Sequence, residues 1–333
     1  MTTACPEVKA GHILPSFPQP VTTGTSPPFL VSPEDGILAV LMQNILEDIK
    51  TIVGLAINED LGTGDLTSAL TIPAEHMSEG KIIAKADGII SGMLVVEYIL
   101  KTFTSVHYQI LRGDGAFATS GETVVQLKGS TIEILSYERV ILNFLQHLSG
   151  IATYTNEFVM KVANYGCKVL DTRKTLPGMR KLAKKAVLDG GGMNHRMGLY
   201  AAILIKENHI LSAGSITKAF RQIEEAPHYN VLREQPGFFI QVECETLEQV
   251  RESCELGVDE ILLDNMPLPI MKSAISLIRQ LSPHASIEVS GNVTLSTVLK
   301  IARLRPDRIS IGKITHSAPV LDLSLLLDDV LII

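Results

Sequence analysis

The sequence has few cysteines and no long apolar run. Its four cysteines stand far apart among 333 residues and form no C-x-x-C pair, which argues against a zinc site and against a disulfide framework. The longest apolar stretch, around Leu199 to Ile205, falls well short of the roughly eighteen residues that a membrane helix requires. We therefore expect a soluble protein from a reducing compartment, with the cytoplasm as the default location and no membrane partner.

The first 36 residues lack both apolar periodicity and arginine. They hold seven of the sixteen prolines, together with Ser and Thr, and a single Lys. This composition predicts a disordered tail over residues 1–36. The tail resembles neither a secretory signal nor an ordinary transit peptide, because it has no apolar core and no Arg-rich amphipathic pattern.

The rest of the chain has enough apolar material for a large core, since 46% of the residues are hydrophobic and 20% are charged. From Gly36 to about Leu148 the pattern mixes a helical stretch, Ile37 to Leu55, with alternating strands. After Gly150, short strands rich in Val, Ile and Leu alternate with amphipathic helices. The sequence thus predicts an α+β domain followed by an α/β domain with a parallel sheet.

Six apolar strands of the second domain each end at a polar residue or a glycine. The residues at these ends are Asp171, Lys206, Glu243, Asp264, Ser290 and Gly312. Because the carboxyl ends of parallel strands meet at one edge, we expect these positions to share the rim where (β/α) barrels build their active sites.

Positive charge is concentrated in one short segment of an acidic protein. Asp171 to Lys206 contains eight Lys or Arg and two Asp, a net charge of +6, whereas the whole chain carries −7. Part of this charge, at Arg180, Lys181, Lys184 and Lys185, has the spacing of a solvated helix face. A single basic island indicates a local anionic ligand and argues against a nucleic-acid surface.

The rim offers cations and acids in separate positions. Arg173 and Lys174 follow the first strand, His195 and Arg196 follow a Gly-rich turn, and Lys206 ends the next strand. Arginine binds carboxylates bidentately in a plane, which suits an aromatic dicarboxylate.

Two carboxylates and two glycine-bearing loops follow along the same rim. Glu243 and Asp264 suit ribose hydroxyls or Mg²⁺, which takes hard oxygen ligands and often bridges substrate phosphates. Ser290-Gly291 and Gly312 follow the last two strands, where backbone N–H groups form the usual phosphate site of barrels.

Taken together, the chain resembles the quinolinate phosphoribosyltransferases from about Ile37 to its C-terminus. The stretches that carry the resemblance are EDLGTGDLTS, ERVILNFLQHLSGIAT, DTRKTLPGMR, GGGMNHRMGL, ILIKENHI, VECE, LLDNM, EVSGNV and ITHSA. The sequence departs from the family's usual pattern at two positions. Many relatives carry Asp at the position of Ala201, and a smaller residue is usual at the position of Lys313.

The resemblance implies a fold and an assembly. It implies an N-terminal α/β sandwich domain over 37–148, joined by the C-terminal segment 318–333, and an incomplete TIM-like (β/α) barrel over 149–317 that holds the active site. It further implies a homodimer, or a larger assembly of such dimers, in which Arg139 reaches across to the partner's barrel.

The resemblance also implies roles for site residues, with Mg²⁺ as cofactor. Quinolinate is expected at Arg139, Arg173, His195, Arg196 and Lys206, and phosphoribosyl pyrophosphate at Lys174, Glu243, Asp264, Ser290, Gly291 and Gly312. Lys174, Lys206, Glu243 and Asp264 are the expected catalytic residues, and Glu243 and Asp264 the expected metal ligands, directly or through water.

Three other functions remain open from the residues. A nicotinate-type phosphoribosyltransferase would share the architecture but bind one carboxylate. A Schiff-base aldolase would use Lys206 at its strand end. A non-catalytic ligand-binding regulator on the same fold is the third alternative.

Overall fold

The structure is a computed structural model that describes residues 33–328, with side chains from Leu46 onward. Most of the predicted tail, residues 1–32, therefore lies outside the described residues. The predicted helix over Ile37 to Leu55 is present and longer, because α1 spans Pro33–Asp60. Ile49 and Val53 of this helix are fully buried.

The N-terminal part is built on an antiparallel sheet with strand order β12-β1-β5-β3. Its strands are β1 (Met77–Ala84), β3 (His107–Ile110), β5 (Thr123–Ser130) and β12 (Leu323–Asp328). A two-stranded ribbon, β2 (Gly88–Ile89) with β4 (Phe117–Ala118), and the helices α2 (Leu66–Thr71) and α3 (Met93–Phe103) complete it. Strand β1 alternates exposed or half-buried with buried residues, so one face of the sheet supplies core side chains.

The C-terminal strand returns to this sheet. β12 pairs antiparallel with β1, from Glu79 opposite Asp328 to Ala84 opposite Leu323. This pairing corresponds to the return of the C-terminal segment that the resemblance implies.

Helix α4 (Thr131–Val162) connects the sheet to the second part of the chain. The Ser130 side chain caps its first turn by accepting a hydrogen bond from the Glu133 backbone N–H. The helix packs against α3, β2, β5 and β12 of the first part and against α5 (Arg180–Asp189) and β6 (Lys168–Leu170) of the second. Its backbone runs without a break past Leu148, the predicted end of the first domain.

The second part contains the six predicted parallel strands. They are β6, β7 (Ile203–Ile205), β8 (Ile240–Cys244), β9 (Glu260–Asp264), β10 (Ser286–Ser290) and β11 (Arg308–Ser310). Their order in the sheet is β6-β11-β10-β9-β8-β7, and every pairing is parallel. Strands β6 and β7 are the two edges of this sheet, so in the described residues the barrel does not close.

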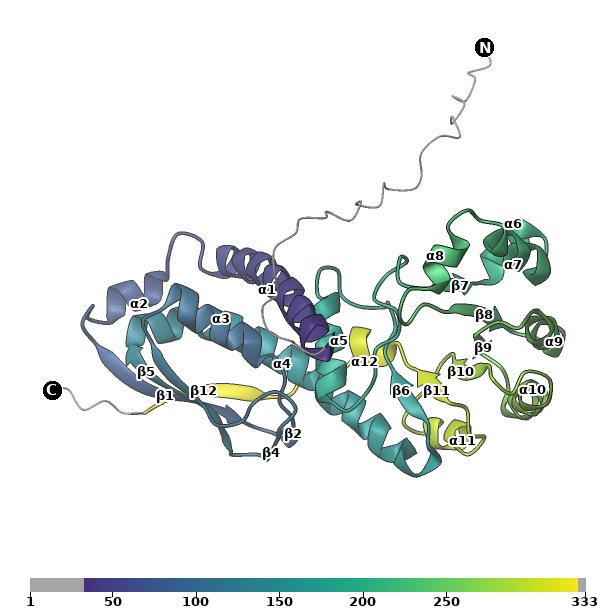
Figure 1. Ribbon diagram of the computed structural model, residues 1–333. Coiled ribbons are helices and arrows are strands. Elements are labelled where there is room, and N and C mark those ends of the chain that lie inside the picture. Colours follow the sequence, from purple (N-terminus) through teal and green to yellow (C-terminus); the bar gives the residue numbers. More distant parts are fainter. Residues whose placement is uncertain (1–32, 329–333) are drawn as a thin grey trace, which may run out of the picture. The chain divides into compact units, whose positions relative to one another are not determined.

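Helices follow these strands along the chain (Figure 1). Besides α5 they are α6 (Glu207–Ala213), α7 (Ile216–Glu224), α8 (Tyr229–Arg233), α9 (Leu247–Leu256), α10 (Leu268–Leu281), α11 (Val298–Ala302) and α12 (Lys313–His316). A 3-10 turn, η1 (Ala163–Tyr165), follows α4. Figure 1 shows α9 and α10 packed side by side on the outer side of β8, β9 and β10.

Four predicted strand ends shift by one or two residues: β8, β9 and β10 run past their apolar segments, whereas β11 ends at Ser310, before Ile311. Asp264 and Ser290 are the last residues of their strands, and Glu243 lies one residue before the end of β8. In β8, β9 and β10 the shift occurs because backbone pairing continues past the apolar run, as in the register that sets Ser290 opposite Asp264.

The described cysteines are buried free thiols, namely Cys167, Cys244 and Cys254. Burial raises the pKa of Cys167 to about 11 and that of Cys244 to about 12, so these two stay protonated and unreactive at neutral pH. None of the described helices is both long and apolar enough to cross a membrane.

Candidate active site

A cavity of about 660 Å³ opens at the carboxyl edge of the parallel sheet. Ten of the eleven predicted site residues line it: Arg173, Lys174, His195, Arg196, Lys206, Glu243, Asp264, Ser290, Gly291 and Gly312. Five of the six predicted strand-end residues thus share one rim, whereas Asp171 is fully buried and does not line the cavity. The contacts that the lining residues would make with substrates stay predictions. The cavity also includes Lys313.

Two guanidinium groups lie close together on one side of the cavity. Burial, and then the neighbouring charge of Arg173, lower the pKa of the Arg196 guanidinium. The Nε of Arg173 is buried and has no hydrogen-bond partner in the part of the chain that the structure describes. Neighbouring cations with an unsatisfied donor make a site that an anion would stabilise, because the anion removes both the repulsion and the unmet hydrogen bond.

His195 is held as a neutral ring. Its Nδ1 accepts the backbone N–H of Arg196 at 2.7 Å, which places the ring proton on Nε2, 3.2 Å from Oε1 of Gln241. Burial lowers the pKa of the imidazole more than the nearby Glu288 raises it. Both ring nitrogens are thus occupied within the protein, so a direct contact with a ligand carboxylate would require His195 to release one of these bonds.

The acidic side of the cavity is paired with neutral donors and one lysine. Lys206 Nζ donates to Glu243 Oε2 at 2.9 Å. Asp264 accepts a short hydrogen bond from the Ser290 hydroxyl on one oxygen, and one at 2.6 Å from the Asn265 amide on the other. The sequence assigned Lys206 to the cationic side, but its ammonium group forms an ion pair with a carboxylate of the acidic side.

The loop after β10 depends on a glycine. Gly291 has a φ of 95°, in the left-handed region, and a Cβ there would lie 2.2 Å from Oδ1 of Asn265. Only glycine allows this approach of backbone to neighbouring side chain. Gly312 lies at the first turn of α12, near the Lys174 and His316 side chains. Both loops present backbone at the cavity, as a phosphate site requires.

A buried polar chain that we did not predict extends away from the cavity, beginning at Glu288, which lines it. Gln241 Nε2 donates to Glu288 Oε2 at 3.1 Å and to Glu260 Oε2 at 3.3 Å, and Arg308 pairs with Glu260 at 2.6 Å. Side chains two residues apart on a strand lie on the same face. Gln241 therefore lies on the same face as Glu243, and Glu288 on the same face as Ser290. Polar residues within otherwise apolar strands were the signal that could have revealed this chain.

Glu260 gives a prediction for pH-dependent stability. Burial, only partly offset by Arg308, raises its pKa to about 7 from an ordinary 4.5. As pH rises from about 4 to 7 the unfolded chain loses this proton first, so the folded state loses relative stability. We expect the free energy of unfolding to fall by about 2 to 3 kcal/mol more in the parent than in Glu260→Gln across this range. Denaturant melts at several pH values measure this, and parallel profiles for the two proteins would contradict it.

Lys184 of α5 does not lie on a solvated face, which corrects the prediction for this lysine, whereas Lys181 and Lys185 are partly exposed. Lys184 is fully buried and paired with the equally buried Asp171. Lys185 lies between Asp114 and Asp189, with both ion pairs at 2.8 Å, and Lys181 pairs with Asp48 at 2.9 Å. The spacing fits a surface helix, but the helix is covered by other parts of the chain.

Arg139 is the one predicted site residue that does not line the cavity. It lies on α4 and is exposed. The expected contribution of Arg139 to a partner's site stays a prediction.

Comparison with known proteins gives the same family over both parts of the chain. Residues 65–149 match the N-terminal domain model of quinolinate phosphoribosyl transferase, and residues 151–326 match its C-terminal domain model. A probable nicotinate-nucleotide pyrophosphorylase (carboxylating) of Synechocystis is 40% identical, over 80% of this chain and 88% of its own length.

Two further relatives extend this agreement. A mitochondrial quinolinate phosphoribosyltransferase (decarboxylating) of Nicotiana glauca is 39% identical, over 84% of this chain and 82% of its own length. The solved nicotinate-nucleotide pyrophosphorylase of Francisella tularensis superposes with a TM-score of 0.78 at 34% identity, covering 85% of this chain and 96% of that one. The chain belongs to the quinolinate phosphoribosyltransferase family.

Proposed function

We propose that this protein transfers the phosphoribosyl group of phosphoribosyl pyrophosphate to the nitrogen of quinolinate, forming nicotinate mononucleotide, pyrophosphate and carbon dioxide in de novo NAD biosynthesis. The observation that carries the proposal is the pair of neighbouring guanidinium groups beside carboxylates and glycine loops in one cavity. The names of the relatives support the same reaction.

Quinolinate binds on the cationic side. Arg173 and Arg196 receive its two carboxylates, with Lys206 nearby and His195 holding the loop of Arg196 or contacting the substrate. A dicarboxylate fits two clustered guanidinium groups better than the single carboxylate of nicotinate would. Human nicotinic acid phosphoribosyltransferase shares only the fold with this chain, at 12% identity and a TM-score of 0.51.

Phosphoribosyl pyrophosphate binds on the acidic side. Glu243 and Asp264 hold the ribose hydroxyls, Lys174 binds a phosphate, and the backbone at Gly291 and Gly312, with the Ser290 hydroxyl, receives the 5′-phosphate. Lys174, Lys206, Glu243 and Asp264 are the catalytic residues of this proposal.

The acidic residues fit Mg²⁺ as a shared ligand of protein and substrate. Among the described residues, no group of three or more His, Cys, Asp or Glu could form a metal cage. Two carboxylates without a third protein ligand match Mg²⁺, which keeps waters and binds through one or two carboxylates plus substrate phosphates. Glu243 and Asp264 would hold the ion, directly or through water, and its charge would stabilise the departing pyrophosphate.

The proposed reaction depends on the alignment of the two substrates and on the stabilisation of the charges that develop. It forms no covalent intermediate with the enzyme. The cationic side aims the pyridine nitrogen at C1 of the ribose, the N–C1 bond forms, and the C1–O bond to pyrophosphate breaks. Lys174 and Lys206 stabilise the negative charge that leaves, and Glu243 and Asp264 the positive charge that develops on the ribose. The cationic ring then accepts the electron pair of the C2–carboxylate bond, carbon dioxide departs, and C2 takes up a proton.

The active protein in this proposal is a homodimer with shared sites. Exposure of Arg139 outside its own cavity supports a role in the partner's site. For location we propose the cytoplasm, although the names of five plant relatives state mitochondria or chloroplasts. Microscopy of the tagged full-length chain decides this point.

The substrate proposal is tested by turnover with two acids. Purified protein with phosphoribosyl pyrophosphate and Mg²⁺ is expected to form nicotinate mononucleotide from quinolinate and to form little or none from nicotinate. A preference for nicotinate would favour the alternative phosphoribosyltransferase. Borohydride trapping of a carbonyl substrate on Lys206 would favour an aldolase. Chelation of Mg²⁺ with EDTA is expected to stop turnover, and full activity in EDTA would remove Mg²⁺ from the proposal.

A further inference from the structure

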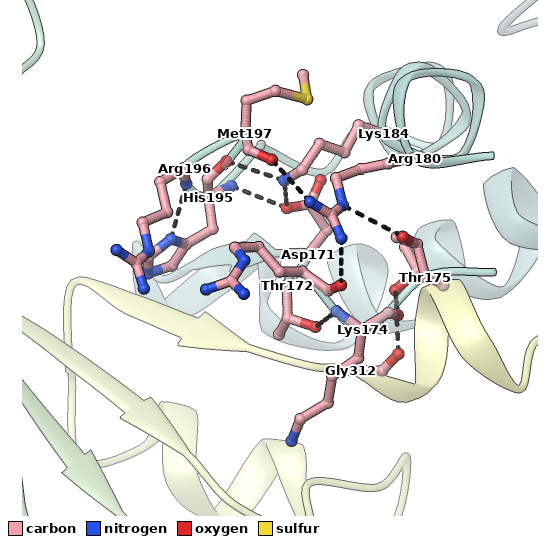
Figure 2. A network of polar contacts seen from close by, with 12 residues as sticks. Asp171, Thr172, Lys174, Thr175, Arg180, Lys184, His195, Arg196, Met197 and Gly312 are labelled. Atoms are coloured by element: carbon pink, nitrogen blue, oxygen red, sulfur yellow. Dashed lines mark hydrogen bonds and ion pairs between the residues drawn. The ribbon is translucent and has the colours of Figure 1, made fainter. Parts of the chain in front are cut away.

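Arg180, at the start of α5, holds two loops through their backbone. Its Nη2 donates to the carbonyl of Arg173 at 3.2 Å and its Nη1 to the carbonyl of Met197 at 3.3 Å, while Nε donates to the Thr175 hydroxyl at 3.3 Å. Figure 2 shows this guanidinium lying between the two loops. One side chain therefore ties the loop of Arg173 to the loop that carries Arg196.

Lys184, one helical turn further along α5, holds the second loop from below. Its Nζ donates to the His195 carbonyl at 2.9 Å and forms a close ion pair with Asp171. The same Asp171 oxygen accepts the His195 backbone N–H at 2.9 Å. The buried pair thus fixes both polar backbone groups of His195, immediately before Arg196 (Figure 2).

The next residue of the first loop is fixed from a different element. The carbonyl of Lys174 accepts a hydrogen bond from the Thr315 hydroxyl of α12 at 2.8 Å, not from α5. Figure 2 shows the Lys174 and Arg196 side chains extending from different sides of the network. The backbone carbonyls of these two adjacent residues, which are assigned to different substrates, are therefore held by different helices. Arg180 also bonds the Thr175 side chain on the other side of Lys174.

The hydrogen bonds from α5 hold two neighbouring guanidinium groups of the same charge. Besides burial, the nearby charge of Arg173 lowers the pKa of Arg196, so two positive charges lie near each other when no anion is bound. Hydrogen bonds from α5 to the backbone of both loops hold the guanidinium groups in place before the anion arrives. Preorganisation of this kind favours binding because the loops lose less freedom when the ligand enters.

We propose that Arg180 and Lys184 are positioning residues that hold the quinolinate-binding cations, whereas Thr315 positions Lys174 for phosphoribosyl pyrophosphate. The proposal rests on the substrate assignments of the proposed function. Neither α5 residue lines the cavity, so both act through the backbone that they hold.

The test compares Arg180→Met with Thr315→Val by calorimetric titration of each substrate. Arg180→Met is expected to weaken quinolinate binding about tenfold and to change phosphoribosyl pyrophosphate binding by less than about twofold. Thr315→Val is expected to weaken phosphoribosyl pyrophosphate binding and to leave quinolinate binding nearly unchanged. Arg180→Lys should recover part of the quinolinate affinity, because one ammonium replaces some of the donors but not the fork.

Two more variants complete the comparison, one as a control on the same helix and one as a test of the buried ion pair. Lys181→Met lies on the same helix and pairs with Asp48, and it is expected to leave both affinities within about twofold of the parent. Lys184→Met combined with Asp171→Asn removes both buried charges together and avoids leaving one unpaired. It is expected to weaken quinolinate binding selectively, with melting temperature recorded for every variant.

The outcomes separate this proposal from the function on which it rests. Suppose that Arg173→Ala weakens quinolinate binding. If folded Arg180→Met then leaves quinolinate binding unchanged, or weakens the binding of both substrates equally, the positioning proposal is wrong. If Arg173→Ala and Arg196→Ala both leave quinolinate binding unchanged, the substrate assignment itself fails. A selective loss in Arg180→Met beside the opposite loss in Thr315→Val supports the proposal.

Discussion

A randomly exchanged mixture of Arg139→Ala and Lys206→Ala chains is expected to recover about one quarter of the parent activity, and isolated mixed dimers about one half, although each variant alone is nearly inactive. In either pure dimer every site lacks one cation, for which we expect roughly a hundredfold loss of turnover. In a mixed dimer, one barrel keeps its own Lys206 and receives Arg139 from the partner. Random exchange makes about half the dimers mixed, each with one intact site of two.

The structure supplies a matched control for this experiment. Arg173 and Lys206 line the same cavity of one chain, so a mixture of Arg173→Ala with Lys206→Ala leaves one defect in every site. This mixture should stay at the activity of its parents. Co-expression with two different tags allows mixed dimers to be isolated. If isolated Arg139→Ala/Lys206→Ala dimers also stay inactive, Arg139 does not serve the partner's site.

Replacing Arg173 or Arg196 by Ala is expected to weaken quinolinate binding by about 10- to 150-fold. A charge-assisted hydrogen bond of this kind contributes about 1.5 to 3 kcal/mol. The unsatisfied Nε of Arg173 and the lowered pKa of Arg196 indicate that the ligand supplies what these groups lack. Binding of phosphoribosyl pyrophosphate should change much less.

Lys174→Ala gives the reciprocal comparison, since Lys174 follows Arg173 in the chain but is assigned to the other substrate. We expect it to weaken phosphoribosyl pyrophosphate binding and to leave quinolinate binding nearly unchanged. Calorimetry on the three variants measures both affinities. A larger loss for phosphoribosyl pyrophosphate than for quinolinate in Arg173→Ala would reverse the assignment of the two sides.

Much of the second domain could be predicted because its strands follow a simple rule. A buried parallel strand is an apolar run, and the polar residue that ends it lies at the carboxyl edge. Asp264 and Ser290 illustrate this, each within one residue of the predicted end. The order of strands could not be derived in this way, because β6 pairs with β11 and a pattern along the chain does not show which strands are neighbours.

The supports of the site were harder to predict than its lining. Lys184 has the spacing of a surface helix, and only its contacts with Asp171 and the His195 carbonyl, from distant segments, reveal its burial. His195 was assigned to the substrate, yet its two ring nitrogens bond to the Arg196 backbone and to Gln241. Such contacts depend on backbone geometry between distant segments, which residue types alone do not specify.

The most direct test of the proposed reaction follows the carbon that it releases. Quinolinate labelled with ¹³C in the C2 carboxylate is incubated with the purified protein, phosphoribosyl pyrophosphate and Mg²⁺. We expect all the label that leaves quinolinate to appear as carbon dioxide, in equal amount to pyrophosphate and to unlabelled nicotinate mononucleotide. Pyrophosphate released without labelled carbon dioxide, or a folded protein that forms no nicotinate mononucleotide, would contradict a decarboxylating phosphoribosyl transfer.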